Sequence, residues 1–174
     1  MASMIGPVRM DLGVTIQRNV EVSSHSFVDL FKGFEKVEAV RAIFGDKAEK
    51  VLAGLSVVLS PRMGYLHIDG SNGAIIISAP YLKSADERYI YLDLIHELVH
   101  VKQYMKGMEL WDERYSYVDR PTEIEAHSHA VREARRIGMK DEEIVDYLRV
   151  EWISKEEFER LLKVLDARLK IKAK

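Results

Sequence analysis

Hydrophobic and polar positions divide the chain into a first part of mixed pattern and a second part of longer helical repeats. Residues 12–22 alternate loosely between apolar and polar side chains, which predicts a first strand. Ser24 or Ser26 can cap a helix that continues to about position 36. A second, interrupted helical stretch is expected over about 37–55. The N-terminal third is therefore predicted to be mainly helical after one strand.

The pattern changes near position 55, where β-branched residues gather in three short runs. Turn-forming sequences, PRM and GSN, separate these runs and favour tight reversals of the chain. Consecutive strands joined by tight turns pair in antiparallel fashion, so we expect a small antiparallel meander. The three predicted strands are LSVVLS (55–60), GYLHID (64–69) and GAIIIS (73–78).

Capping signals divide the second half of the chain into helices. The segment Ser84-Ala-Asp-Glu87 has the form of a capping box, and Gly107 is a suitable end for the helix that it opens. Residues 108–120 have no clear period and are expected to be a loop. Helices are predicted over about 85–106, 121–138, 141–149 and 154–169. Strands followed by helices indicate an α+β fold, with a small antiparallel sheet packed on the helices.

Length and composition fit one domain without a membrane segment. A chain of 174 residues can bury a substantial core, and 47% of its residues are hydrophobic. The formal net charge of −2 argues against nucleic acid as a partner. No apolar run has the length of a transmembrane or secretory segment, so we expect a cytoplasmic protein with no membrane partner. Scarce Asn and Gln, with abundant Glu, Lys and Arg, favour a thermophilic source.

The segment LIHELVHVKQ (94–103) places polar, titratable groups in an otherwise apolar helix. His96 and His100 stand four residues apart, so both imidazoles lie on one helix face and can bind one metal ion. The chain has no cysteine, which leaves His, Asp and Glu as ligands, and zinc suits that set, although cobalt or manganese could also occupy it. Glu97 lies about 100° around the helix, where it can act as general base on a zinc-bound water. This arrangement is the HExxH motif.

Two histidines leave a zinc ion short of protein ligands, and the segment PTEIEAHSHA (121–130) offers the missing one. On a helical projection the apolar residues centre between Glu123 and His127, whereas Glu125 and His129 fall on the polar face. A carboxylate directed into a core needs a strong partner, so Glu123 is chosen as the third ligand. His127 is expected beside it, and Glu125 is expected in solvent, completing a helix cap and next in line as ligand.

These residues resemble a known family. The motif HELVH (96–100), followed 23 residues later by Glu123, resembles the gluzincin metallopeptidases. The segment EIEAH (123–127) is similar to the E-x-x-A-D pattern of the CAAX-protease and minigluzincin groups and of small repressor-cleaving regulators. In that pattern the first Glu is the third zinc ligand, in agreement with the helical projection. The resemblance covers roughly residues 73–134 and departs at His127, where those families carry Asp or Asn.

The resemblance implies further roles around the site. The strand 73–78, upstream of the motif, is expected to form the rim of the cleft and to pair with an extended peptide. A second donor to the oxyanion is expected from Tyr115, Tyr117 or His127, of which His127 and Tyr115 are taken as catalytic candidates. Asp93, three residues before His96, can orient a zinc-binding histidine or lie on the helix surface.

The sequence therefore favours a zinc-dependent peptidase that hydrolyses a peptide or protein substrate. We expect one domain over 1–174, with a catalytic core at about 55–138 and a helical extension at about 139–174. The alternative is a non-catalytic or latent regulatory zinc-binding protein on the same scaffold, with residues 150–174 as a possible block of the cleft. The third hypothesis is a structural protein in which the HExxH motif occurs by chance. Oligomeric state has no signal in the sequence.

Overall fold

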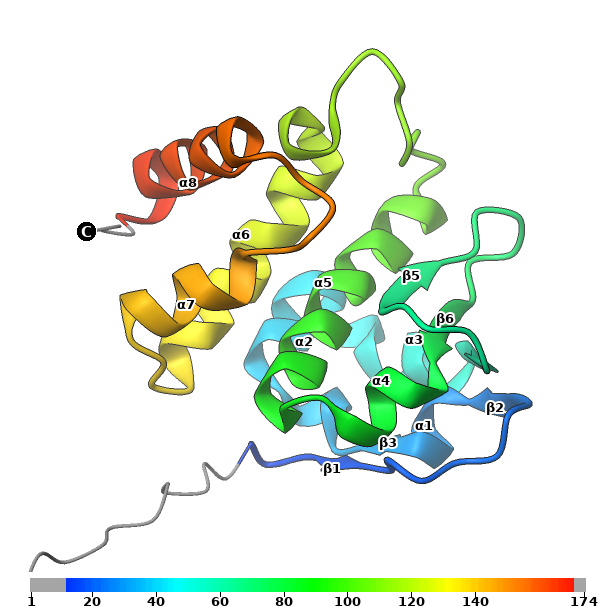
Figure 1. Cartoon of the computed structure of the whole chain (residues 1–174). Helices are drawn as coiled ribbons and strands as arrows, with labels where there is room; N and C mark the ends of the chain where they lie inside the picture. Colours follow the sequence, from blue (N-terminus) through cyan, green and yellow to red (C-terminus); the bar gives the residue numbers. More distant parts are fainter. Residues whose placement is uncertain (1–11, 171–174) are drawn as a thin grey trace, which may run out of the picture.

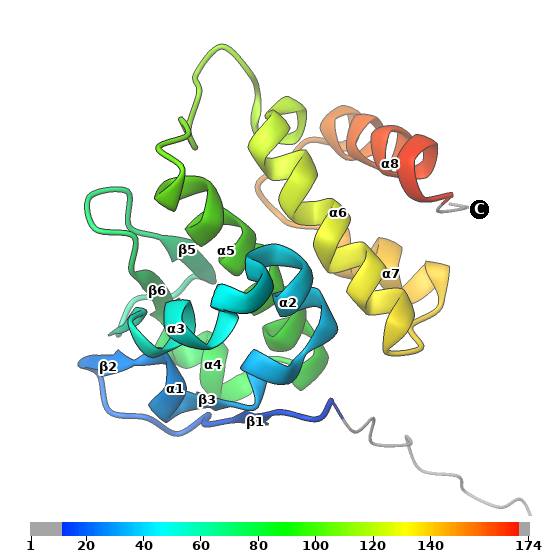
Figure 2. The ribbon, with the colours of Figure 1, turned by 180° about the vertical axis from the view of Figure 1, so that it is seen from behind.

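The computed structural model describes residues 12–170 and has an α+β fold (Figure 1). Helix α5 runs between the sheet on one side and α6 on the other, as the views from front and back both show (Figure 2). The strands are β1 (Thr15–Ile16), β2 (Ser24–Ser26), β3 (Phe31–Lys32), β4 (Ser56–Ser60), β5 (Leu66–Ile68) and β6 (Ile75–Ser78). The helices are α1 (Phe27–Leu30), α2 (Glu38–Phe44), α3 (Ala48–Ala53), α4 (Ala79–Ser84), α5 (Glu87–Met105), α6 (Pro121–Arg136), α7 (Asp141–Leu148) and α8 (Lys155–Leu169), with 3₁₀ turns η1 (Phe34–Lys36), η2 (Gly45–Lys47) and η3 (Tyr117–Asp119).

The main sheet has the order β2-β4-β6-β5 and is mixed. The three predicted strand positions are found, but the predicted meander is wrong because β4 pairs with β6 in parallel, and β5 pairs only with β6. β6 therefore lies between two partners, β4 and β5, and its Ile75 and Ile77 are fully buried on one face of the sheet. As a result β5, and not β6, lies at one edge of this sheet, and β2 lies at the other.

The N-terminal third differs most from its prediction. The predicted strand over 12–22 is reduced to β1, which pairs with β3, and the predicted helix over about 24–36 is broken into β2, α1, β3 and η1. Phe27, Phe31 and Phe34 have helical spacing, but they meet in the core because the chain folds back at Gly33. Gly33 has a φ of 90°, which glycine adopts readily. The interrupted stretch over 37–55 is confirmed as α2, η2 and α3.

Helix α5 is buried along most of its length because the sheet and α6 cover opposite sides of it. The N-cap of α5 is Asp86, whose Oδ1 accepts a hydrogen bond from the backbone N–H of Arg88 at 2.8 Å. The predicted capping box at Ser84 is wrong, because Ser84 ends α4 and its hydroxyl donates to the Pro80 carbonyl. The helix ends as predicted before Gly107, which has a φ of 70°.

The C-terminal helices lie beside α6 and complete the layer opposite the sheet (Figure 1). The capping box of α8 is confirmed, since Ser154 and Glu157 exchange hydrogen bonds between side chain and backbone. The predicted cap at Thr122 is wrong, because its hydroxyl donates to the carbonyl of Leu110 in the preceding loop. Of residues 150–174, the structure describes those up to 170. Within the described range, no helix has both the length and the apolar character needed to cross a membrane.

Candidate metal centre and its cleft

Two imidazoles and one carboxylate converge between α5 and α6. Nε2 of His96 lies 3.1 Å from Oε2 of Glu123 and 3.1 Å from Nε2 of His100, and the latter nitrogen lies 3.3 Å from the same carboxylate oxygen. All three side chains are buried. Ligands at 2.0–2.1 Å from a tetrahedral ion are separated from one another by roughly 3.3 Å. The three donor atoms therefore have the spacing of groups that share one metal ion.

Helix geometry explains why these residues meet. His96 and His100 lie one turn apart on the face of α5 that packs against α6, and Glu123 lies in the first turns of α6 on its buried side. A looser group of His96, Glu123 and His127 also has its donor atoms within 4.8 Å of one another. We assign the set of His96, His100 and Glu123 because its donor atoms lie 3.1–3.3 Å from one another. Nε2 of His127 is hydrogen-bonded to Tyr117, and its buried Nδ1 has no partner within the described chain.

The charges of the three groups are coupled. Burial favours the neutral form of Glu123, but hydrogen bonds from His100 and His96 outweigh it and hold the pKa of this carboxyl well below its usual range. Burial lowers the pKa of His100, yet the hydrogen bond to Glu123 and the charge of Glu97 raise it to about 9. The site thus holds an ionised carboxylate that attracts positive charge, which a metal ion supplies in place of protons.

Gln103 fixes the orientation of His100, and the sequence reasoning overlooked it. Its Oε1 lies 2.7 Å from Nδ1 of His100, while its amide nitrogen donates to the Thr122 carbonyl at 3.1 Å and to Oε2 of Glu125 at 2.7 Å. With both donors engaged on α6, the amide oxygen must accept from Nδ1–H. In the neutral imidazole, Nε2 then presents its lone pair to the site. The sequence feature that could have indicated this contact is a glutamine three residues after His100 in an otherwise apolar helix.

Glu125 and His129 do not lie fully in solvent. Both are half-buried, and Glu125 accepts the hydrogen bond from Gln103. The expectation that Glu125 is a solvated residue is wrong because α5 packs across the start of α6 and covers it. Glu125 instead helps to hold Gln103 against His100.

Glu97 lies beside the donor group with one carboxylate oxygen free. The residue is 7% exposed, and Oε2 has no hydrogen-bond partner within the described part of the chain. Burial raises the pKa of Glu97, and the nearby His100 and His96 oppose that change. An unpaired buried oxygen is costly, so its retention points to a partner that is not another residue of the described chain.

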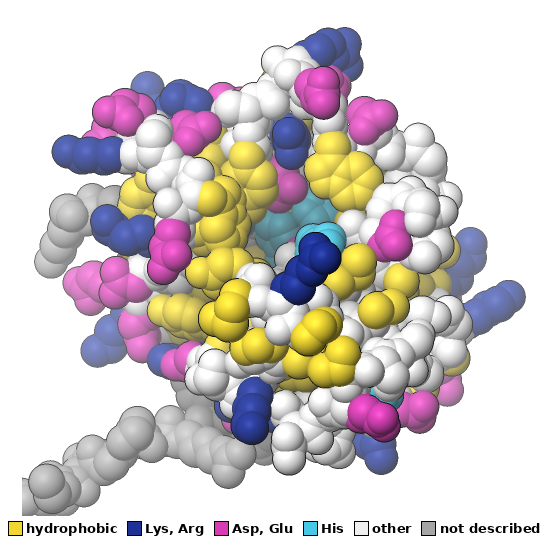
Figure 3. All heavy atoms as spheres, turned by 45° about the vertical axis from the view of Figure 1, so that its right-hand side comes forward, with side chains coloured by type: hydrophobic (Ala, Val, Ile, Leu, Met, Phe, Trp, Pro, Cys, Tyr) yellow, Lys and Arg dark blue, Asp and Glu magenta, His cyan; other side chains and the backbone are white. Residues whose placement is uncertain are grey.

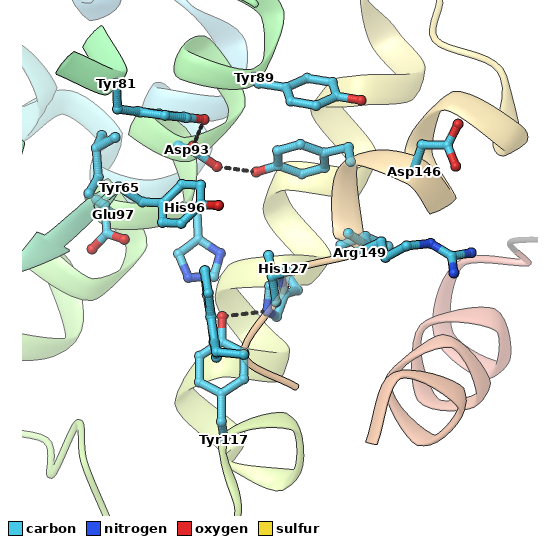
Figure 4. A pocket seen from close by; sticks show the side chains of 15 residues that line it. Tyr65, Tyr81, Tyr89, Asp93, His96, Glu97, Tyr117, His127, Asp146 and Arg149 are labelled. Atoms are coloured by element: carbon cyan, nitrogen blue, oxygen red, sulfur yellow. Dashed lines mark hydrogen bonds between the residues drawn. The ribbon is translucent and has the colours of Figure 1, made fainter. Parts of the chain in front are cut away.

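Tyr117 and His127 form a hydrogen-bonded pair next to the donor group (Figure 4). The Tyr117 hydroxyl lies 3.1 Å from Nε2 of His127, and both residues line the cavity that contains Glu97. Burial lowers the pKa of His127 to about 3, so its imidazole is neutral at pH 7. Tyr115 is 41% exposed, borders neither cavity of the cleft and lies beside Arg114. The structure therefore brings Tyr117 to the site in the place where Tyr115 was expected.

Histidine side chains are visible at the bottom of a hollow that hydrophobic residues surround (Figure 3). Two cavities, of 260 and 210 Å³, adjoin the donor group. His96, Glu97 and Tyr117 border both of them, and so does Trp152 from the connection between α7 and α8. The edge strand β5 contributes Leu66 to both cavities, so an edge strand borders the cleft.

The chain matches no protein-family model, and neither curated proteins nor solved structures show significant similarity to it. The resemblance to gluzincins therefore rests on the motif residues and on the buried His–Glu–His group. That group defines a candidate metal-binding protein of α+β fold.

Proposed function

We propose that this chain is a zinc-dependent peptidase of gluzincin type. The observation that carries the proposal is the set of three donor atoms at 3.1–3.3 Å from one another, with Glu97 beside them and a cleft leading to them. Two imidazoles and one carboxylate suit zinc, and three protein ligands leave a coordination position for chemistry. His96, His100 and Glu123 would hold the ion. When bound, zinc supplies Lewis acidity, which polarises a peptide carbonyl and acidifies water.

The chain itself supplies the proton transfers. Glu97 takes a proton from the attacking water and passes it to the leaving amine, as its free buried oxygen permits. In the tautomer of His127 that carries its proton on Nε2, this N–H donates to the Tyr117 oxygen, and the Tyr117 O–H is left to donate to the oxygen that becomes negatively charged during attack. His127 thus acts through Tyr117, and Tyr115 has no role in the proposed reaction.

The substrate is proposed to be an extended peptide that adds to the edge strand β5. The expectation that residues 73–78 form the rim of the cleft is wrong, because β6 is paired on both sides. Residues Leu66–Ile68 border the cleft and have one free edge, which supports β5 in that role. Peptide addition supplies backbone hydrogen bonds irrespective of sequence, and the cavities select side chains.

A latent regulatory zinc protein is the second candidate, and Trp152 favours it. This residue packs its ring 5.0 Å from that of Tyr65 and 6.3 Å from that of Tyr117, and it borders both cavities. The connection between α7 and α8 therefore narrows the cleft. Replacement of Trp152 by Ala accelerates peptide cleavage if the connection inhibits the site, and leaves or lowers the rate if Trp152 serves as a substrate contact.

The test of the peptidase proposal compares wild type with Glu97→Gln. Zinc content is measured by elemental analysis, and cleavage is measured on an unstructured protein such as casein. We expect about one zinc per chain in both proteins, and a cleavage rate lower by about a thousandfold in the variant. Equal rates in the two proteins, or no zinc in either after incubation with it, would contradict the proposal. The cytoplasmic location, the thermophilic source and the absence of nucleic-acid and membrane partners stay predictions.

A further inference from the structure

The larger of the two cavities has an aromatic wall. Its sides come from elements far apart in the sequence, namely the approach to β5, helices α4 and α5, and helix α7 with the connection after it. His96 and Glu97 border the same cavity, so it opens directly onto the candidate metal centre (Figure 4). We call it the tyrosine cavity, after Tyr65, Tyr81, Tyr89 and Tyr147, which line it together with Trp152.

A carboxylate stands at the base of the tyrosine cavity without a positive partner. Asp93 accepts hydrogen bonds from Tyr81 at 2.6 Å and from Tyr147 at 2.9 Å, one on each oxygen (Figure 4). It forms no ion pair with any described lysine or arginine. The sequence-based suggestion that Asp93 orients a zinc-binding histidine finds no contact here, because tyrosines occupy both oxygens.

The arginine nearest to this cavity is turned away from the carboxylate. Arg149 borders the cavity, but its side chain points away from Asp93 (Figure 4). Its guanidinium lies 4.8 Å from the ring centre of Phe158 on α8. The other charged groups around the cavity are Glu97 and the exposed Asp146, both acidic. The interior therefore combines negative charge with aromatic rings. Both features attract a cation, because each carboxylate retains unused lone pairs and the rings offer negative faces.

We propose that the tyrosine cavity binds a lysine or arginine side chain of the substrate, with Asp93 as its counter-charge. The inference rests on the proposed peptidase function for the identity of the ligand. Asp93 lies about one helical turn before Glu97, so a basic side chain that reaches it has its backbone beside the candidate metal centre. The cavity thus selects the residue next to the scissile bond.

A binding experiment tests the cavity without any cleavage. Zinc-loaded wild type is titrated by calorimetry with lysinamide and with norleucinamide, which differ at the end of the side chain by the ammonium group. We expect lysinamide to bind at least about tenfold more tightly, and this preference to disappear in Asp93→Asn. Asp146→Asn, which removes an exposed acid at the cavity rim, is the matched control and retains the preference.

Equal affinity for the two amides, absence of binding by either, or a preference that survives in Asp93→Asn overturns the proposal. If Asp93→Asn does not fold, the comparison of the two amides on wild type decides alone. A peptide series with Lys, Arg, Leu or Glu next to the scissile bond then separates the two proposals. Cleavage without preference for basic residues would overturn the cavity assignment and support the peptidase proposal. Lysinamide binding without cleavage of any peptide would support the cavity assignment and overturn the peptidase proposal.

Discussion

Helix α6 carries two buried glutamates that face α5, and their surroundings differ. Glu133 is 3% exposed and accepts three hydrogen bonds from Arg136 at 2.6–3.0 Å and another from the Tyr91 hydroxyl. Glu123 is 6% exposed and faces two imidazoles. The first carboxylate is neutralised by an arginine of its own helix. The partners of Glu123 are two histidines, which become positive when they take up a proton.

The difference distinguishes a structural carboxylate from a binding one. Burial of an ionised group costs several kcal/mol unless a cation or a full set of hydrogen bonds compensates it. Glu133 obtains that compensation from a permanently charged arginine, whereas Glu123 obtains it from histidines that must first bind a proton, or from an added cation. Asp93 is of the second kind, since its partners are neutral tyrosine hydroxyls. Glu123 and Asp93 therefore differ from Glu133 in having no lysine or arginine partner within the described chain.

The largest effect is expected on metal affinity. Glu123→Gln should weaken zinc binding by about a thousandfold, because it removes a charged ligand, while Glu133→Gln should leave the affinity unchanged. Competition with a chelator of known affinity measures both. Equal losses in the two variants would show that the α5–α6 packing, and not the ligand set, governs the affinity.

The second prediction concerns pH and the carboxylate of the tyrosine cavity. Burial raises the pKa of Asp93 from 3.8 to about 6, against the hydrogen bonds from Tyr81 and Tyr147. The folded state then binds the Asp93 proton more tightly than the unfolded state, so this stabilisation is complete below pH 3.8 and is lost as pH rises past 6. The loss is on the order of 3 kcal/mol, from 1.36 kcal/mol per pKa unit.

Asp93→Asn has no proton to lose at this position. Its free energy of unfolding relative to wild type should therefore improve by up to about 3 kcal/mol between pH 4 and pH 7.5. Urea denaturation of both proteins at the two pH values measures this difference, and the other titrating groups cancel because both proteins contain them. A constant difference between the proteins would mean that Asp93 ionises normally.

A smaller effect is expected from the structural glutamate. Glu133→Gln should lower the free energy of unfolding by about 2 kcal/mol, since Arg136 loses its charged partner but remains half exposed to water. Without zinc, Glu123→Gln should also lower the free energy of unfolding, because it removes the ionised carboxylate that pairs with His100, whose pKa is raised to about 9. Denaturation of both variants in the presence of a chelator gives the comparison. An increase in stability of Glu123→Gln over wild type would show that the histidines do not compensate its charge in the metal-free protein.

The smallest predicted effect lies beyond the ligands themselves. Gln103→Leu removes the acceptor for Nδ1 of His100, so the imidazole can adopt the wrong tautomer, and zinc affinity should fall by about tenfold. Ser128→Ala is a suitable control, because Ser128 is a buried polar residue of α6 whose hydroxyl bonds only the Ile124 carbonyl. Chelator competition measures both variants. An unchanged affinity in Gln103→Leu would mean that packing alone orients His100.

The sequence determined the local geometry of the site and the α+β class. The four-residue spacing of His96 and His100 and the buried face of Glu123 follow from helical periodicity, and the structure brings the three side chains together. These relations lie within one helix or along one helix face, so a periodic pattern suffices to predict them. The helix ends at Gly107 and Ser154 were predictable for the same reason.

Tertiary structure decided everything that depends on which elements become neighbours. The parallel pairing of β4 with β6 and the position of β5 at one edge of the sheet are properties of the assembled sheet. The contact of Gln103 with Glu125 and the turn of Asp93 towards two tyrosines join residues from separate helices. Spacing along the chain cannot predict such contacts, because they arise from how whole helices and strands pack, and packing depends on the sum of many weak interactions.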